Sequence, residues 1–461
     1  MEGKIIIKSP LNNKEIGEVV AMSQEEVNNK IKKSKEALKK WKALTTYERG
    51  EYLYKIATLL EEKEDELSEL LMLEVGKDLK SAKSEVTRTV DIIRQTVETA
   101  KNICGKSIPA DIVSGAKKEK IAITTRVPMG VVLAVSPFNY PVNLAMSKIA
   151  PALIGGNTVI FKPATQGSLC GTYLCEIFKK ANLPESVVEL VTGKGSQIGD
   201  YIVTHEDINF INFTGSTSTG KHIAKKTGMI PLLMELGGKD AAIVLEDADL
   251  EKAAKQIVSG AFSYSGQRCT AIKRVLAVDS IAEELTKKIQ DNIAELKIGN
   301  PIDKQNYDVV PLIDTSSADF VWKLITDAKE KGAKILTGDI REGNLIYPTL
   351  ITNVTLDMDI AWYEPFGPVL PIIKIKDTQE AIKIANMSEY GLQSSVFTKD
   401  FNKAFEISNS LEVGTVQINN KTERGPDHLP FLGVKSSGIG VQGISYSIES
   451  MTNIKSIVIN V

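Results

Sequence analysis

The 461-residue chain has a formal net charge of −2, with 43% hydrophobic and 25% charged residues, a balance typical of a globular protein of two or three domains. It lacks the strong basic excess that nucleic-acid binding normally needs, and no apolar run is long enough to span a membrane. Four cysteines are too few for a disulfide framework, and the start Met-Glu-Gly-Lys lacks a secretory signal, so we expect a cytoplasmic protein with reduced thiols.

The N-terminal segment is expected to form two short strands followed by helices. The strands run from Lys4 to Lys8 and from Glu15 to Ala21. A long helix is expected from about Leu79 to Cys104, because apolar residues recur on one stripe, and Arg88 falls on roughly the opposite face. Two earlier helix starts carry the spacing of capping boxes, Ser23 with Glu26 and Thr45 with Glu48.

Beyond Val127 the pattern changes to alternating strands and helices. Short apolar runs are typical of strands buried on both faces, as in parallel sheets built from βαβ units. We expect a doubly wound sheet before Leu245 and a second α/β sheet after it, with a cleft between them. The expected strands are Val131–Val135, Thr158–Phe161, Val187–Leu190, Ile208–Phe213 and Leu232–Leu236 in the first sheet, and Arg274–Val278, Val369–Ile375, Ser394–Thr398 and Thr415–Ile418 in the second.

The last stretch, from Ser445 to Val461, ends in an alternating, β-rich sequence. Such a strand, left unpaired, would be an edge prone to aggregation. We expect it to pair either within an oligomer or with strands of its own chain.

One short segment, Ser265 to Thr270, is the strongest candidate for catalysis. Cys269 follows a glycine turn, and Arg268 beside it is expected to lower the pKa of the thiol and favour the nucleophilic thiolate. Glu235, in Met-Glu-Leu-Gly-Gly, offers a carboxylate that could act as a base in a covalent mechanism. Taken alone, the cysteine would be weak evidence, since a free cysteine is more often a small buried hydrophobic residue. The three histidines lie far apart without partners at ligand spacing, so no metal site is expected.

Two glycine-rich turns indicate a nucleotide site. Gly215 to Lys221 is close to a Walker A phosphate loop, but His222 replaces the Ser or Thr that would hold magnesium, which argues against NTP hydrolysis. The order of strand, Gly/Ser turn and helix still suits an anion, although a tight turn without a ligand would look the same. Gly193 to Gly199 is a near miss to the dinucleotide fingerprint, and Lys162 places a cation at the end of a candidate strand. Dinucleotide binding is therefore the prediction.

Six motifs occur in chain order: Pro137-Phe138-Asn139-Tyr140-Pro141, Phe161-Lys162-Pro163-Ala164, Phe213-Thr214-Gly215-Ser216, Met234-Glu235-Leu236-Gly237-Gly238, Gly266-Gln267-Arg268-Cys269 and Glu364-Pro365-Phe366-Gly367-Pro368. Their sequence and spacing resemble the aldehyde dehydrogenase superfamily along essentially the whole chain. The resemblance implies an α/β fold with a Rossmann-like cofactor domain (1–116 and 127–240), a second α/β catalytic domain (241–430) and a small β oligomerisation element (117–126 and 431–461). It also implies a homodimer or homotetramer.

The resemblance implies a covalent oxidation of an aldehyde. Cys269 would attack the carbonyl carbon, and the side-chain amide of Asn139 with the Cys269 backbone N–H would hold the oxyanion. Hydride transfer to a nicotinamide would leave a thioacyl-enzyme, and Glu235 would activate the water that hydrolyses it. The residues implied to contact the cofactor are Lys162, Thr165, Gly215, Ser216, Leu236, Glu364 and Phe366.

The residue three positions after Lys162 bears on the choice of cofactor. Many NAD-dependent relatives carry a glutamate there, which binds the adenosine ribose 2′-hydroxyl, whereas this chain has Thr165. A carboxylate would repel a 2′-phosphate and a threonine does not, while Lys162 could attract it. We therefore expect NADP, with NAD as the alternative.

Within the superfamily the chain is most similar to the non-phosphorylating glyceraldehyde-3-phosphate dehydrogenases, which oxidise glyceraldehyde 3-phosphate irreversibly to 3-phosphoglycerate. In that branch, residues matching Arg88, Tyr140, Arg268 and Arg424 bind the substrate phosphate, and guanidinium groups suit phosphate oxygens. Lactaldehyde, glycolaldehyde and semialdehyde dehydrogenases are the alternatives. An acyl-transferring relative that uses coenzyme A is disfavoured by Glu235, and a non-enzymatic structural protein by the intact catalytic residues.

Overall fold

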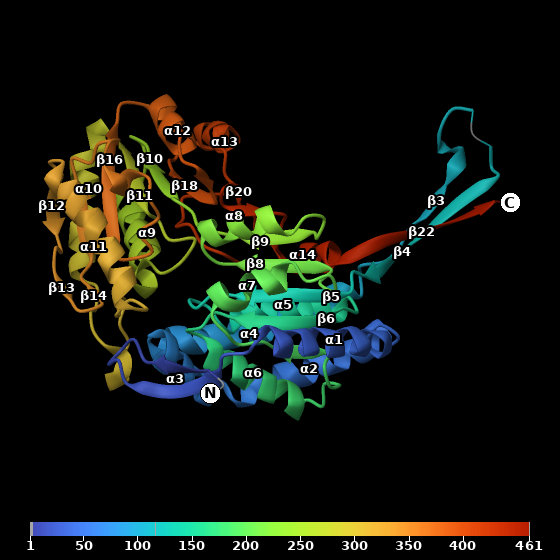
Figure 1. Cartoon of the computed structure of the whole chain (residues 1–461). Coiled ribbons are helices and arrows are strands. Elements are labelled where there is room, and N and C mark those ends of the chain that lie inside the picture. The colour runs from blue at the N-terminus through green and yellow to red at the C-terminus, as the bar shows by residue number, and fades with distance from the viewer. Residues whose placement is uncertain (1–2, 116, 461) are drawn as a thin grey trace.

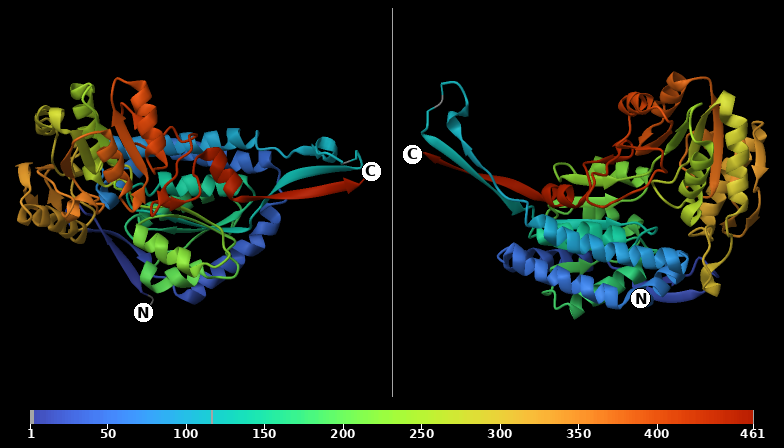
Figure 2. Two further views of the ribbon diagram at one scale, coloured as in Figure 1. Left: turned by 90° about the horizontal axis from the view of Figure 1, so that it is seen from above. Right: turned by 180° about the vertical axis from the view of Figure 1, so that it is seen from behind.

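The computed structural model describes residues 3–115 and 117–460, so residues 1, 2, 116 and 461 of the predicted segments lie outside the described residues. Two α/β units lie side by side, and a thin β arm projects away from them (Figures 1 and 2). The predicted α/β fold is confirmed, because both units are built on sheets of mainly parallel strands.

The N-terminal segment forms a hairpin and then four helices. Both predicted capping boxes are confirmed, with Ser23 and Thr45 each accepting a hydrogen bond from the backbone three residues on. The elements are β1 (Lys4–Lys8), β2 (Glu15–Val20), α1 (Gln24–Trp41), α2 (Thr46–Glu62), α3 (Glu64–Val75) and α4 (Leu79–Ala100).

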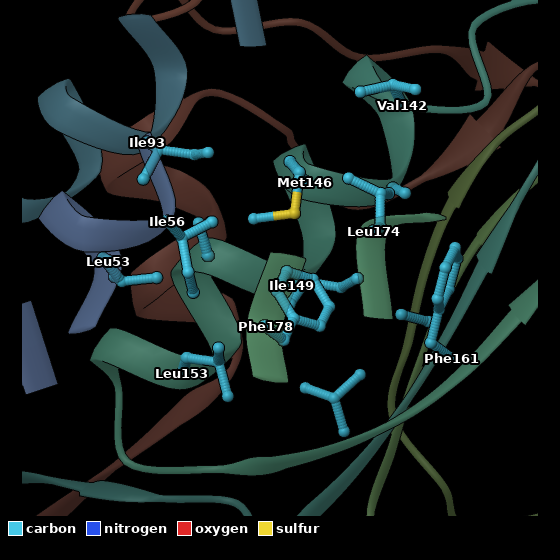
Figure 3. Close-up of a cluster of buried hydrophobic side chains, with 14 of the residues drawn as sticks. Leu53, Ile56, Ile93, Val142, Met146, Ile149, Leu153, Phe161, Leu174 and Phe178 are labelled. Atoms are coloured by element: carbon cyan, nitrogen blue, oxygen red, sulfur yellow. The ribbon is translucent and has the colours of Figure 1, made fainter. Parts of the chain in front are cut away.

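The first large sheet has six strands in the order β21-β9-β8-β5-β6-β7, and all but β21 run parallel. Figure 3 shows side chains from α2, α4, α5 and α6 meeting Phe161 of β6 in one apolar core. The elements are β5 (Val131–Ser136), α5 (Asn143–Ile154), β6 (Thr158–Pro163), α6 (Ser168–Lys180), β7 (Val188–Leu190), α7 (Gly195–Val203), β8 (Phe210–Thr214), α8 (Thr217–Lys226), β9 (Leu232–Glu235) and β21 (Gly438–Ile439).

The second large sheet has seven strands in the order β12-β15-β16-β11-β10-β18-β19, and only the edge strand β12 is antiparallel to its neighbour. None of the helices in the described ranges has the length and apolarity needed to cross a membrane. The elements are β10 (Ala241–Val244), α9 (Leu250–Phe262), β11 (Arg274–Val278), α10 (Asp279–Ala294), α11 (Thr315–Glu330), β12 (Lys334–Thr337), β15 (Thr349–Thr352), β16 (Val369–Ile375), α12 (Thr378–Asn386), β18 (Gln393–Phe397), α13 (Phe401–Ser410) and β19 (Thr415–Ile418).

The arm is a three-stranded sheet, and the other short strands form two-stranded pairs. The arm contains β3 (Ser107–Pro109), β4 (Lys120–Pro128) and β22 (Thr452–Asn460), in the order β22-β4-β3. The C-terminal strand therefore pairs with its own chain, antiparallel to β4 along its whole length. Apolar side chains remain exposed on it, among them Ile454, which is 65% exposed.

The domain boundaries that the sequence analysis gives stay a prediction. The remaining strands and α-helix are β13 (Arg341–Glu342), β14 (Leu345–Ile346), β17 (Tyr390–Gly391), β20 (Val434–Lys435) and α14 (Ile444–Ser450), and four short 3-10 helices are η1 (Ala110–Ile112), η2 (Ser263–Gly266), η3 (Pro301–Asp303) and η4 (Asp359–Ala361).

Candidate active site

The nucleophile loop, residues 263–273, connects α9 to β11 and carries Cys269. Tyr264 and Ser265 adopt left-handed backbone conformations with φ of 51° and 56°, which are strained for residues other than glycine. Buried hydrogen bonds maintain them: the Tyr264 hydroxyl donates to the Val75 carbonyl at 2.6 Å, and the Ser265 hydroxyl donates to a second backbone carbonyl at 2.6 Å. The surrounding structure thus fixes the loop that presents the thiol.

The environment of the Cys269 thiol differs from the sequence prediction. Burial, followed by the carboxylate of Glu235, raises the pKa of Cys269 to about 11. The predicted effect of Arg268 on the thiol is not found, because its guanidinium turns away and donates to the Gly260 carbonyl of α9 at 2.6 Å. The cation that contributes most to lowering the pKa of Cys269 is Lys273.

Glu235 is the last residue of β9 and lies in a chain of buried polar groups. Its Oε2 accepts from Arg424 at 2.8 Å and from the Thr214 hydroxyl at 3.3 Å. Lys148, on α5, donates to the Thr214 hydroxyl at 2.7 Å, and burial lowers the pKa of Lys148 to about 7. Oε1 of Glu235 is buried without a hydrogen-bond partner among the described residues, which leaves this oxygen available to take a proton.

Asn139 and Tyr140 are neighbours in the chain and line different cavities. Asn139 and Cys269 line one of about 510 Å³, here called the Cys269 cavity. Tyr140 and Arg88 line the other, of about 570 Å³, here called the Arg88 cavity. The Asn139 amide donates to the Gln267 carbonyl at 2.9 Å, so it points at the nucleophile loop.

All of the residues predicted to contact the cofactor line the Cys269 cavity. A further cavity of about 590 Å³ between α7 and α8 shares Lys162, Phe213 and Thr219 with it, so the two adjoin. Phe366 has a left-handed φ of 51° and packs edge-on against Phe138 with ring centroids 5.9 Å apart. The two adjoining cavities suit an extended ligand such as a dinucleotide.

The cations and backbone of this site fit a phosphate-bearing ligand. Lys162 is buried, and its ammonium contacts only the Pro163 carbonyl, at 3.4 Å, among the described residues. Burial lowers the pKa of Lys162 to about 8, which marks it as a cation short of partners. Helix α8 begins beside it with Ser216 as its N-cap, and a helix N-terminus attracts anions. A Cβ at Gly215 would lie 2.5 Å from the end of the Phe213 ring, so a larger residue there would require this ring to move.

Arg88, from α4, lines the Arg88 cavity and forms a bidentate ion pair with Asp427, which is not among the described lining residues of that cavity. Its Nε and Nη2 donate to the two carboxylate oxygens of Asp427 at 2.6 and 2.7 Å. Arg424 lies 3.6 Å from the same carboxylate. Asp427 therefore links two of the three arginines predicted to bind substrate, and it lines a small cavity of about 50 Å³ together with Arg424.

Tyr140 rests on a buried ion pair that the sequence analysis did not identify. The Lys77 ammonium lies 3.5 Å from the centroid of the Tyr140 ring and forms a fully buried salt bridge with Glu85. The other oxygen of Glu85 accepts from the backbone N–H groups of Val142 and Asn143, both at 3.0 Å. This pair thus fixes the segment that carries Asn139 and Tyr140.

A family model described as the aldehyde dehydrogenase family matches residues 2–457. The chain belongs to this family. An NADP-dependent glyceraldehyde-3-phosphate dehydrogenase of Streptococcus equinus is 55% identical over 458 residues, covering 99% of this chain and 96% of that relative. A crystal structure of such an enzyme from Bacillus halodurans C-125 with NADP is 55% identical, with a TM-score of 0.98 over 99% of this chain and 96% of that one. A lactaldehyde dehydrogenase of Methanococcus aeolicus is 39% identical, covering 99% and 97%.

The structure brings most of the predicted site residues of this aldehyde dehydrogenase into the Cys269 and Arg88 cavities. Glu235, Arg424 and Arg268 are absent from the described linings of both: Glu235 and Arg424 pair with each other at 2.8 Å, and Arg268 lies against α9. Sequence reasoning also missed Lys148. Its signal was a single charge in α5, where every residue from Asn143 to Ile154 is buried. A buried charge needs partners, which here are the groups around Glu235.

Proposed function

We propose that this aldehyde dehydrogenase oxidises glyceraldehyde 3-phosphate to 3-phosphoglycerate with NADP. The observation that carries the proposal is that the chain neighbours Asn139 and Tyr140 line different cavities, Asn139 with Cys269 and the expected cofactor residues, and Tyr140 with Arg88. A short aldehyde with a terminal phosphate could place its carbonyl at the thiol and its phosphate at the guanidinium. The 55% identity to a relative named for this reaction, against 39% to one named for lactaldehyde, supports the phosphorylated substrate.

The residues of the Cys269 cavity supply a covalent route. Attack of the thiol sulfur on the aldehyde carbon forms a C–S bond and an oxyanion, to which the Asn139 amide can turn from the Gln267 carbonyl. As the oxyanion collapses to the thioester carbonyl, the C–H bond of the former aldehyde carbon breaks, and bound NADP would supply the hydride acceptor and the positive charge of its nicotinamide. Glu235 takes a proton from water as the water oxygen adds to the thioester carbon. The C–S bond then breaks, the thiol of Cys269 is restored with a proton, and the acid leaves.

The experiment that tests this function is an assay of NADPH formation at 340 nm with glyceraldehyde 3-phosphate in the absence of inorganic phosphate. NADP and NAD are compared in parallel, and the product is identified. Formation of 3-phosphoglycerate with a preference for NADP is the expected result. Turnover of lactaldehyde or a semialdehyde without turnover of the phosphorylated substrate would overturn the substrate and keep the mechanism.

Thr165→Glu is expected to weaken NADP binding by about tenfold or more, because a carboxylate in this cavity would repel the 2′-phosphate. The same carboxylate could accept the ribose hydroxyl of NAD, so the preference should move toward NAD. Thr165→Gln is the matched control, since it has nearly the same shape without the charge. Titration of each protein with both cofactors checks this. Equal loss in the two variants would show that size rather than charge is responsible.

Arg88→Met is expected to raise KM for glyceraldehyde 3-phosphate by about tenfold or more, while KM for unphosphorylated glyceraldehyde changes little. Arg88 is a cleaner test than Arg424, because Arg424 also pairs with the base Glu235. Arg94→Met, on the same helix and paired with Glu61 at the surface, is the control. Steady-state kinetics with both aldehydes are the measurement. An equal rise for both would contradict the phosphate site.

We also propose that a second copy of the chain covers the β arm, giving a homodimer or homotetramer. Ile454, Ile457 and Val458 are exposed on β22, and Ile121 and Ile123 on β4, which is an unusual number of apolar side chains for a surface in contact with solvent.

All four cysteines are free in the structure, which supports our proposal of a reducing compartment such as the cytoplasm.

A further inference from the structure

Lys273 is the last residue of the nucleophile loop and is almost completely buried. Its ammonium donates to the carbonyl of Cys269 itself and to the carbonyl of Ala271 at 3.2 Å. It also forms an ion pair with Oε1 of Glu364 at 3.3 Å. A lysine ammonium has three N–H donors, so these contacts use all of them. One buried cation therefore joins the nucleophile to a carboxylate that lines the same cavity.

The two carboxylate oxygens of Glu364 differ in their contacts: Oε1 accepts from the protein, and Oε2 is not used by these contacts. The backbone N–H of Gly238 donates to Oε1 at 3.2 Å, the same oxygen that Lys273 contacts. Neither contact uses Oε2. Burial raises the pKa of Glu364, and the charge of Lys273 is the first influence opposing it. Lys273 thus favours the ionised carboxylate, which can accept hydrogen bonds but cannot donate one.

Two other buried cations lie near, and neither makes these contacts. The ammonium of Lys239 is buried and has no hydrogen-bond partner among the described residues. Burial holds the pKa of Lys239 well below its usual range. Arg274 donates instead to the backbone carbonyls of Ala361 and Ala385. Lys239 therefore offers a matched control, since it is a lysine of the same cluster without the contacts of Lys273.

We propose that Lys273 is a positioning residue whose ammonium ties the backbone of the nucleophile to the Glu364 carboxylate. This single ammonium favours the thiolate form of Cys269 and also holds the carboxylate that would accept a cofactor hydroxyl. The proposal rests on the proposed function only in taking NADP as the cofactor. It replaces Arg268 as the cation that acts on Cys269 from within its own loop.

The charged groups around the thiol give the direction of the expected effect. Glu235 and Glu364 raise the pKa of Cys269, while Lys273 and Arg424 lower it. Lys148 also interacts with Cys269. Removing Lys273 takes away the largest of the influences that lower the pKa of the thiol. The thiol should then ionise at higher pH, and at a fixed pH a smaller fraction is the reactive thiolate.

The first measurement uses the enzyme without cofactor or substrate. Iodoacetamide alkylation of Cys269 is followed between pH 7 and 10 by mass spectrometry of its peptide, which separates it from the exposed Cys104. Lys273→Met is expected to slow alkylation about tenfold at a given pH and to move the profile to higher pH. Lys239→Met is expected to leave the profile unchanged. Equal rates in wild type and Lys273→Met, or equal slowing in both variants, would overturn the proposal.

The second measurement is NADP binding to wild type, Lys273→Met, Glu364→Gln and the double variant. Each single change is expected to weaken binding several-fold, and the double variant should be little weaker than Glu364→Gln, because Lys273 acts through that carboxylate. Simple additivity would overturn the proposal. If Lys273→Met did not fold, Lys273→Gln, which keeps a donor and removes the charge, carries the same expectations.

These results separate the proposal from the proposed function. Neither measurement contains an aldehyde, so a different substrate would leave both unchanged. Failure of wild type to bind NADP would reject the cofactor assignment, while the difference in alkylation between Lys273→Met and Lys239→Met would still decide the role of Lys273.

Discussion

Replacement of Cys269 with alanine is expected to lower kcat for aldehyde oxidation by about 10⁴-fold or more, since no covalent intermediate can then form. The loop around it should keep its shape, because its strained residues are held by their own hydrogen bonds to distant carbonyls. NADP binding should therefore persist. NADPH formation at 340 nm and cofactor titration of the same protein are the measurements.

Cys104→Ala is the control for this change, because Cys104 is an exposed free thiol far along the chain from the loop. It should turn over as wild type does. A Cys269→Ala enzyme with appreciable turnover would contradict the covalent mechanism, whereas loss of both turnover and cofactor binding would indicate a collapsed site.

Glu235→Gln is expected to lower steady-state turnover by about 10²- to 10⁴-fold, the range usual for loss of a general base. Hydride leaves before water attacks, so a single burst of NADPH, stoichiometric with enzyme, should remain. Glutamine keeps a side-chain oxygen that can accept a hydrogen bond from Arg424. Arg424 also keeps its hydrogen bond to the side-chain oxygen of Gln442 at 2.7 Å. Stopped-flow absorbance followed by mass spectrometry of the acylated enzyme checks both parts.

Glu246→Gln removes a carboxylate that pairs with Lys403 at the surface, and it should behave as wild type in the same experiment. Absence of the burst in Glu235→Gln would place its role before hydride transfer. A burst followed by normal turnover would show that another group activates the water.

Local signals in the sequence predicted most of the fold. The capping boxes at Ser23 and Thr45 depend on residues three apart, and both were found. The apolar run Val131–Val135 became β5 with one further residue, whereas the long helix ends at Ala100 rather than near Cys104. Helix ends without a strong stop signal are decided by tertiary packing, which a single sequence does not display.

For the site, too, local sequence motifs were informative and contacts between distant elements were not. Motif residues such as Glu364 and Lys162 were predicted, and the structure brings them to one cavity. The direction of a side chain was not predictable, because it depends on elements distant in sequence. Arg268 is next to Cys269 in the chain, but its side chain donates to the Gly260 carbonyl. Lys273, four residues after Cys269, donates to the carbonyl of the nucleophile. Proximity in sequence therefore did not predict what these side chains touch, and the roles that the resemblance implies for the site residues stay predictions.

The β arm has a consequence for how this protein should be handled. Its apolar residues contribute little to the core of one chain, since Ile457 and Val458 are more than half exposed. If a second copy covers them, as proposed, part of the free energy of unfolding belongs to association and follows mass action. The temperature of unfolding then rises with protein concentration, and a dilute enzyme assay and a concentrated thermal scan report on different populations of the same chain.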